Sequence, residues 1–386
     1  MAFPALAGAQ EGEVDPIPEP RPLLDGPHDP FGLGLKKISY SVGLRIVELY
    51  DNNIFLVPDG ETSDFVTVFH LSADLRHDYQ AGEARVNYRA EDRVFARQAQ
   101  FNGVEHFLTA SATLEPKPLK FEAGLDWKDL KDPFDVLQVT GHFDTHYDRE
   151  VLKATADFNR FDVEVIAGLS HFTIDDEILD RGDYERRELA VTGLWEAWSQ
   201  FALLAEIGIE ETDYVEAEFS DFTFLRVTVG ARGTPSPKTR IEAHVGLGRA
   251  EPDGTGILPV QDVTEFLVRA SASWDIGERQ ELKLELRREP VESVETGLAI
   301  AEGVEVTYRH DLAERWSAQI MGSWGRRVES DGSGGRTGIQ ARTHLRWTSP
   351  GQVYADVGLL FRARDGDDPS LDYGNFQLSL GLGVQW

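Results

Sequence analysis

The stretch NFQLSLGLGVQW, residues 375–386, alternates between apolar side chains and polar or very small ones. Side chains two residues apart share one face of a β-strand, so this pattern predicts a strand with a single apolar face. That face consists of Phe376, Leu378, Leu380, Leu382, Val384 and Trp386. The alternation runs up to an aromatic residue. We therefore expect this strand to close a sheet by pairing with the chain near residues 38–50.

The same period of two recurs throughout the chain after Lys37. In residues 64–76, for example, Phe65 and Leu71 fall on the face opposite to His70 and Arg76. Comparable segments occupy residues 83–96, 119–128, 201–209, 241–247, 282–286, 336–347 and 353–361. No segment has the period of a long amphipathic helix, so the sequence predicts an all-β protein.

Two architectures produce such strands, and the connections between strands distinguish them. A soluble sandwich turns its apolar face inward, whereas a membrane barrel turns it toward lipid. Tight links are predicted at residues 79–83, 115–118, 159–162, 196–200, 275–280, 310–315 and 348–352. Longer links fall between them, at residues 53–63, 175–184, 210–221, 249–262, 288–296, 327–335 and 364–372. This regular alternation of short and long connections favours the barrel.

The predicted fold is a transmembrane antiparallel up-and-down β-barrel of about 18 strands, with residues 129–147 as one loop. A hairpin within that loop would raise the count to about 20, and about 16 strands is a further alternative. In a barrel of the bacterial outer membrane, we expect the short turns in the periplasm and the long acidic loops outside the cell.

Composition narrows the function classes. The chain has 386 residues, no cysteine and a formal net charge of −29. Nucleic-acid binding needs a basic surface, so this acidity argues against a nucleic-acid partner. The content of 41% hydrophobic and 10% aromatic residues is too high for a disordered chain. No apolar run is long enough to predict a transmembrane helix.

The N-terminal part differs from the rest. Residues 1–10, MAFPALAGAQ, have the small-residue pattern of a signal-peptide cleavage region, and we interpret them as a signal-peptide remnant. Residues 11–37 are rich in proline and acidic residues, which predicts an extended arm. The barrel is expected to span residues 38–386.

Aromatic residues lie mostly near the ends of the predicted strands, where the aromatic girdles of membrane barrels occur. The candidates are Tyr50, Phe55, Trp127, Tyr184, Trp195, Trp198, Trp274, Tyr308, Trp316, Trp324, Trp347, Tyr354 and Trp386.

Residues 38–77 resemble the opening of the beta-barrel porin 2 family of bacterial outer-membrane proteins. The likeness rests on a strand that ends in a Tyr-Asp-x-Asn-Ile-Phe motif, followed by Ser-Asp and a second strand. The matching residues are Tyr50, Asp51, Asn53, Ile54, Phe55, Ser63 and Asp64. The resemblance implies an outer-membrane barrel associated with exopolysaccharide production and export. Read locally, Asp and Asn cap a turn, and Ile54 and Phe55 could fold back onto the rim.

Charged residues alternate with the apolar faces and are predicted to line the barrel lumen. They are Arg76, Arg85, Arg89, Glu91, Arg93, Glu122, Asp126, Glu206, Glu242, Lys283, Glu285, Arg287, Arg342, Arg346 and Arg362. Such mixed charge either forms cross-strand ion pairs that stiffen the wall or sets the selectivity of a wet pore. The sequence leaves both uses open.

No catalytic or metal-binding motif stands out. The chain has no Gly-x-Ser-x-Gly, Ser-x-x-Lys or His-Glu-x-x-His segment, so we predict no enzyme activity and no cofactor. The acidic segment with Asp365, Asp367 and Asp368 could bind calcium loosely, although its spacing is not that of an EF-hand.

The favoured function is an outer-membrane channel for hydrophilic solutes that could assist polysaccharide export. The alternative is a scaffold barrel with an occluded lumen, which binds a partner through its arm or its acidic loops. An outer-membrane hydrolase comes third. Expected partners are outer-membrane lipid and lipopolysaccharide, polysaccharide-export components and the barrel assembly machinery, which would read Trp386 as its signal.

Overall fold

The computed structural model describes residues 38–56, 61–79, 81–131, 144–175, 183–215, 220–253, 262–293, 297–329, 334–367 and 372–386. The predicted signal remnant 1–10 and arm 11–37 lie outside these residues. The first nine strands are β1 (Ile38–Asp51), β2 (Asp64–Tyr79), β3 (Gly82–Phe95), β4 (Gly103–Leu114), β5 (Leu119–Leu130), β6 (Asp144–Asp157), β7 (Phe161–Asp175), β8 (Tyr184–Trp198) and β9 (Phe201–Tyr214). The others are β10 (Phe222–Ser236), β11 (Thr239–Pro252), β12 (Val263–Gly277), β13 (Gln280–Ser293), β14 (Gly297–Ala313), β15 (Trp316–Glu329), β16 (Gly335–Thr348), β17 (Val353–Gly366) and β18 (Tyr373–Gln385). A single helical turn, η1 (Ala99–Phe101), follows β3.

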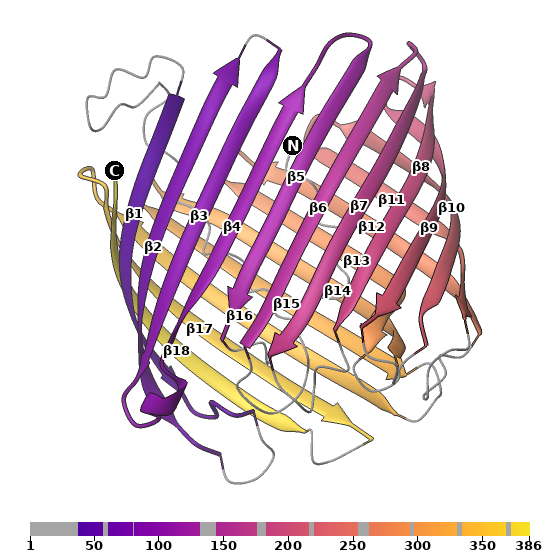
Figure 1. Ribbon diagram of the computed structural model, residues 1–386. Helices are drawn as coiled ribbons and strands as arrows, with labels where there is room; N and C mark the ends of the chain where they lie inside the picture. The colour runs from indigo at the N-terminus through magenta and orange to yellow at the C-terminus, as the bar shows by residue number, and fades with distance from the viewer. Residues whose placement is uncertain are drawn as a thin grey trace.

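These strands form one closed sheet of 18 strands, in which each strand pairs antiparallel with its neighbours in the sequence. The barrel closes between β1 and β18, whose register runs from Gly43 opposite Gln385 to Asp51 opposite Gln377. Figure 1 shows the two strands side by side at the edge of the view. The predicted up-and-down barrel is therefore confirmed, and the counts of 16 and 20 are wrong.

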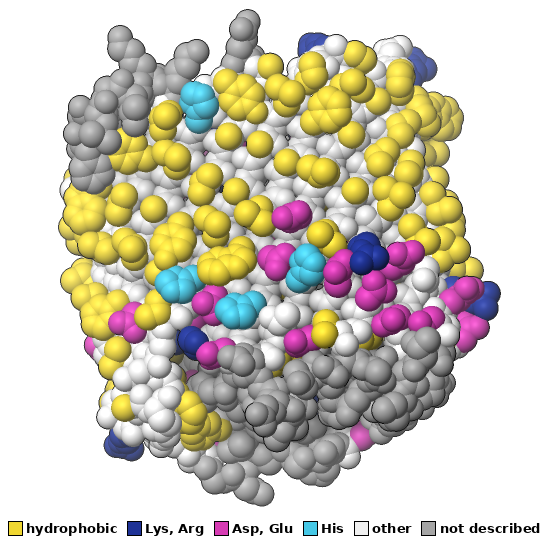
Figure 2. All heavy atoms as spheres, in the orientation of Figure 1, with side chains coloured by type: hydrophobic (Ala, Val, Ile, Leu, Met, Phe, Trp, Pro, Cys, Tyr) yellow, Lys and Arg dark blue, Asp and Glu magenta, His cyan; other side chains and the backbone are white. Residues whose placement is uncertain are grey.

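Alternation along the strands gives the barrel an apolar outside. Phe69, Val229, Ile320 and Leu382 are among the many large apolar side chains that remain exposed. Figure 2 shows hydrophobic side chains spread over much of the visible wall. A closed sheet with an apolar outer belt leaves no unpaired edge in lipid, which makes this a transmembrane barrel rather than a soluble sandwich. Among the described residues, no helix is long and apolar enough to cross a membrane.

One end of the barrel has short turns and the other has longer connections, as predicted. The short-turn end includes the links after β8, β10, β12 and β14, where one strand ends within three residues of the next. Several long connections are shorter than expected because the strands continue further. The clearest case is the predicted link 288–296, since β13 runs to Ser293 and β14 begins at Gly297.

Three of the predicted girdle aromatics, Phe55, Tyr184 and Tyr354, face inward instead. Tyr184 packs against an inner cluster that contains Tyr214 and Phe224, and Tyr354 is buried beneath the Arg346 guanidinium. Alternation along β8 and β17 places Tyr184 and Tyr354 on the lumen side, whereas Phe55 belongs to the connection after β1. Trp195, Trp198 and Trp274 remain exposed on the outer wall.

Candidate functional site

The candidate site is the inner wall of the barrel. The cross-strand register places every side chain that was predicted to line the pore on the face opposite to the exposed apolar belt. The partners of these charged side chains differ from one sector of the wall to another. Most of the side chains form ion pairs with neighbouring residues, whereas a few have no ion-pair partner among the described residues.

The sector formed by β2, β3 and β4 is tightly paired around Glu91. This carboxylate lies 3.1 Å from Arg89, 3.6 Å from Arg93 and 3.1 Å from the His70 ring. Arg93 also reaches the buried Glu105 at 3.0 Å. Nearer the short-turn end, Arg85 pairs with Asp74 at 2.6 Å, and Arg76 pairs with Glu83 at 2.9 Å. These contacts tie adjacent strands together, as cross-strand charge pairs do.

A second paired sector spans β5 to β11. Its centre is Arg226, which lies 2.7 Å from Glu188 and 2.9 Å from Glu206. Gly208 leaves room for this guanidinium, because a Cβ there would lie 2.8 Å from its carbon. Further pairs join Arg232 to Glu242 at 2.7 Å, Lys120 to Glu122 at 3.0 Å and Lys128 to Asp126 at 3.4 Å.

A third group lies beside the closing seam. Arg45 of β1 pairs with the buried Asp356 of β17, and His344 approaches the same carboxylate at 3.4 Å. Arg346 lies over the Tyr354 ring at 4.7 Å, and Arg362 donates to Asn375 at 3.1 Å. Arg342 lies opposite Met321 on the same inner face.

The wall of β12, β13 and β14 differs, because some of the like charges that face each other there have no ion-pair partner among the described residues. Arg269 is directly opposite Arg287, and Glu285 is directly opposite Glu305. Within the described residues, neither arginine nor Glu285 has a partner at ion-pair distance, and Lys283 has only Glu281 at 3.7 Å. Like charges opposite each other are destabilising unless water or a ligand separates them. This sector therefore presents its charges to the lumen.

Residues 54–56 of the motif turn into the barrel at the long-connection end. Ile54 does not lie on the rim but packs inside the barrel, against Val47, Val66, Val68 and Phe95. Phe55 contacts the Phe101 ring edge at a centroid distance of 5.3 Å. Leu56 is 2% exposed and has a φ of 50°, a strained backbone conformation for a branched residue that burial of the side chain can hold.

The polar residues of the motif join the seam to the neighbouring loop. Asp51 accepts hydrogen bonds from Asn375 at 2.6 Å, from Gln377 at 2.7 Å and from the Asn53 amide at 2.8 Å. The Asp64 carboxylate accepts from the backbone amides of residues 97 and 98, at 3.0 and 3.1 Å. Tyr50 stays on the outer face and stacks obliquely on Phe65. The local interpretation as a capped turn is therefore confirmed.

A second inward element lies at the same end, where β13 meets β14. Four consecutive residues, 298–301, are only 1%, 0%, 6% and 3% exposed, so both faces of this segment are covered. Leu298 packs with Phe224 and Leu267 from the inner wall, and Val291 packs with Ala299 and Ala301. The start of β14 thus packs against the inner wall through Leu298.

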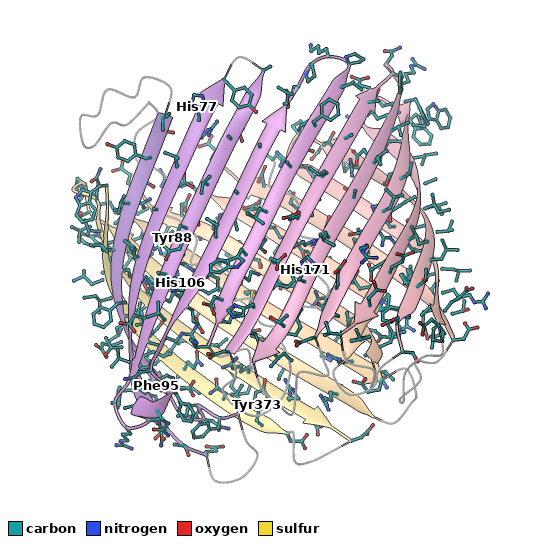
Figure 3. The ribbon with its side chains drawn as sticks, in the orientation of Figure 1. His77, Tyr88, Phe95, His106, His171 and Tyr373 are labelled. Carbon is teal, nitrogen blue, oxygen red and sulfur yellow. The ribbon has the colours of Figure 1, made fainter. Side chains whose placement is uncertain are left out.

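The outer wall carries a polar belt that the sequence analysis missed. Figure 2 shows acidic and histidine side chains gathered below the apolar surface, toward the long connections. His171 lies 2.9 Å from Asp148, and Glu185 lies 2.6 Å from Arg187. Figure 3 places His106 and His171 at this level, with Phe95 and Tyr373 closer to the long connections and His77 at the opposite end. Asp262 lies just before β12, and the hydrogen bond that it accepts from the Arg249 guanidinium lowers the pKa of its carboxyl group.

The remaining candidates are placed as follows. Asp367 accepts a hydrogen bond from the Gly335 amide at 2.8 Å, Asp365 lies opposite Thr337, and Asp368 is outside the described residues. The described part of the chain contains no group of three or more His, Asp or Glu side chains suited to a metal ion. Trp386 pairs with Val42 through its backbone, at 2.9 and 3.1 Å, and its role as an assembly signal stays a prediction.

Comparison with known proteins adds only distant likenesses. No family model matches the chain, and no curated protein matches it. Among solved structures, the barrel is similar to OccK2 (OpdF) of Pseudomonas aeruginosa, with 10% identity, a TM-score of 0.49, and coverage of 90% of this chain and 98% of that one. It is also similar to OpdQ of the same organism, with 9% identity, a TM-score of 0.49, and coverage of 91% and 99%. OccAB3 of Acinetobacter baumannii has 10% identity and a TM-score of 0.46, over 90% and 99% of the two chains. These values are too low to carry an argument about function.

Proposed function

We propose that the protein is an outer-membrane channel that passes small hydrophilic solutes along its barrel axis. The observation that supports this most directly is the inverted surface, apolar outside and charged inside, around 18 strands. Barrels of about 16–18 strands are wide enough to leave an aqueous lumen. The unpaired sector of β12 to β14 supplies charges that a passing solute can contact.

The sequence left two roles open for the inner charges, stiffening of the wall and selectivity of the pore, and we assign them to different parts of the wall. In this proposal, the ion pairs around Glu91 and Arg226 stiffen the wall, while Arg269, Arg287 and Glu285 set the selectivity of the pore. The long connections would face outward and the short turns the periplasm. Export of a polysaccharide rests on the motif at residues 38–77 alone and is a narrower form of the same proposal.

A swelling assay with proteoliposomes tests the channel. Vesicles that contain the folded protein should swell in an isotonic monosaccharide faster than vesicles without protein, and should swell little in a large oligosaccharide. Equal rates with and without the folded barrel would contradict the proposal. A uronic acid in place of the neutral sugar then reports whether the unpaired arginines favour anions.

A scaffold with an occluded lumen is the second candidate, because Ile54 and Leu298 both pack inside the barrel at the long-connection end. Deletion of residues 11–37 separates the two. Loss of a co-purifying protein, without any change in vesicle swelling, would favour the scaffold. A change in swelling without loss of a partner would favour a channel that the arm regulates.

A further inference from the structure

The barrel wall is split between two neighbouring strands at the long-connection end. The ladder between β12 and β13 ends where Val268 pairs with Arg288. Beyond that point β12 continues to pair with β11, up to Ala250 opposite Val263. β13 likewise continues to pair with β14, up to Ser293 opposite Gly297. Residues 263–267 and 289–293 therefore form two strand edges that are not joined to each other.

The split follows from the inward turn of the β13–β14 hairpin. The start of β14 packs with the inner wall through Leu298, which draws the end of β13 away from β12. Pro290 lies within this unpaired edge, where its missing N–H costs no ladder bond. Arg288 crosses to the other edge, where its Nε donates to the Phe266 carbonyl at 3.1 Å and its guanidinium pairs with Glu265. A side chain thus satisfies one of the backbone groups that the split leaves open.

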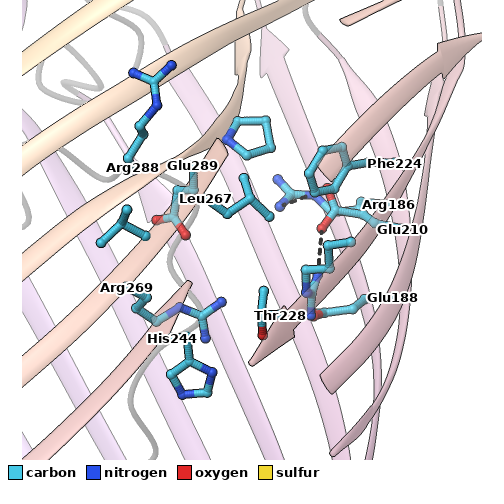
Figure 4. Close-up of a pocket in the computed structure, with 13 residues that line it drawn as sticks. Arg186, Glu188, Glu210, Phe224, Thr228, His244, Leu267, Arg269, Arg288 and Glu289 are labelled. Carbon is cyan, nitrogen blue, oxygen red and sulfur yellow. Dashed lines mark hydrogen bonds and ion pairs between the residues drawn. The ribbon is translucent and has the colours of Figure 1, made fainter. Parts of the chain in front are cut away.

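A cavity of about 60 Å³ occupies the split and is lined from both faces of the wall. Arg269, Glu289 and Leu267 belong to the inner face, whereas Val268, Arg288 and Pro290 belong to the outer face by alternation. Figure 4 shows Arg269, Arg288, Glu289 and Leu267 around this space, with Phe224, Arg186 and Glu210 across it. Residues of both faces thus lie around one cavity at the place where the ladder between β12 and β13 is open.

The chemistry of the cavity is amphipathic. Its apolar side consists of Phe224, Leu267, Val268 and Pro290. Its polar side contains Arg269, which faces Arg287 and has only Glu289 nearby as an uncommitted carboxylate. Arg226 and Arg288 each pair with two glutamates. Arg269 and the facing Arg287 share a single nearby carboxylate, that of Glu289.

The split begins where the apolar belt ends. Leu286 and Phe266 are the last exposed apolar side chains of β13 and β12 at this level, and Arg288 follows on β13. A membrane of matching thickness places its head groups at such a boundary. A molecule with an anionic head and an apolar tail would have both parts accommodated.

We propose that the split between β12 and β13 is a lateral opening of the lumen that takes up an amphipathic carboxylate. Arg269 and Arg287 receive the head group, and the apolar tail leaves the wall past Leu267, Phe266 and Pro290. This route shares with the proposed axial channel the placement of the barrel in a membrane and the two arginines, but it leaves the lumen through the wall and not along the axis. The two routes can therefore be tested separately.

Engineered cysteines test the split itself, because the chain has none of its own. If the ladder continued, Phe266 and Pro290 would face each other, so the pair Phe266→Cys with Pro290→Cys should form a disulfide on mild oxidation. We expect this pair to stay reduced, because a disulfide needs Cα atoms within about 7 Å. The control pair is Thr223→Cys with Glu251→Cys, which face each other across β10 and β11 and should close. Equal closure of both pairs would overturn the proposal.

Photolabelling tests the ligand. The folded protein in nanodiscs is exposed to palmitic acid with a diazirine in its tail, and labelled residues are mapped by mass spectrometry. Labels should concentrate on Phe266, Leu267 and Pro290, and Arg269→Gln should reduce them severalfold. Arg326→Gln, on the outer face of β15, is the matched control and should leave them unchanged.

Three outcomes would overturn the lateral opening: labels spread evenly around the apolar belt, no effect of Arg269→Gln, or equal labelling by the corresponding uncharged alcohol. Ion conductance measured on the same variants reports the axial channel. A barrel that conducts but is not labelled at the split refutes only the lateral opening. A barrel that is labelled there but never conducts refutes only the axial channel.

Discussion

At the residue scale, glycines of β18 decide how the seam packs. Gly381 and Gly383 belong to the polar face of the stretch NFQLSLGLGVQW, where the sequence showed only small residues. In the barrel, a Cβ at Gly383 would lie 2.4 Å from the Tyr354 ring, and one at Gly381 would lie 2.6 Å from the Asp356 carboxylate. The small residues therefore make room for inner-face side chains of the neighbouring strands.

Gly383→Val should destabilise the barrel because Tyr354 cannot keep its place beneath Arg346. Overpacking of this kind typically costs about 1–3 kcal/mol in the free energy of unfolding. Urea unfolding, followed by the gel shift between folded and unfolded barrel, measures it. Gly374→Val in the same strand is the control, because a Cβ there meets nothing within 4 Å. Equal losses in both variants would contradict the packing explanation.

Asp51→Ala should weaken the seam at the other end of β1. The substitution leaves the buried amide of Asn375 without its 2.6 Å acceptor and removes the bond from Gln377. A buried donor without a partner costs about 1–3 kcal/mol. Glu48→Ala, which removes an exposed hydrogen bond to Thr67, is the comparison. A similar unfolding midpoint for the two variants would show that the Asp51 network does not hold the seam.

At the scale of elements, the strands and their inward faces could be predicted from sequence, because burial on one side imposes a period of two. The two inward elements could not. Ile54 follows a polar turn motif, and its position inside the barrel depends on the inner faces of β1, β2 and β3, which meet only in the assembled wall. The start of β14 left one signal, the apolar run at residues 298–301, which breaks the alternation.

Ile54→Ala should loosen the loop that turns into the barrel. Buried Ile to Ala changes cost about 2–5 kcal/mol, enough to release a short loop from its docking site. We expect larger and noisier single-channel currents than in the unmodified protein. Ile320→Ala, on the exposed outer face of β15, should leave the currents unchanged. If the Ile54 variant conducts like the unmodified protein, the loop is not a constriction.

At the scale of the whole molecule, the alternation along single strands does not predict which inner charges form ion pairs and which do not. Alternation predicts which charges point inward, but their pairing depends on the register of strands that are far apart in sequence, as for Arg45 and Asp356, 311 residues apart. The register also leaves Arg269 opposite Arg287, which sequence spacing does not reveal. Selectivity is therefore a property of the assembled barrel.

Arg287→Glu should shift the ion preference of the pore toward cations, because it reverses a charge that no carboxylate of the described residues pairs at close range. The reversal potential in a salt gradient measures this preference. Arg326→Glu makes the same change in charge on the outer face and should have no effect. A shift of equal size in both variants would indicate a general effect of net charge.

The central claim is that this barrel holds an open aqueous path across a membrane, and current through single barrels in a planar bilayer tests it most directly. The purified, folded protein should produce discrete, ohmic conductance steps when it inserts. Insertion of folded barrels, verified by protease protection in the same lipid, without any current would contradict the claim.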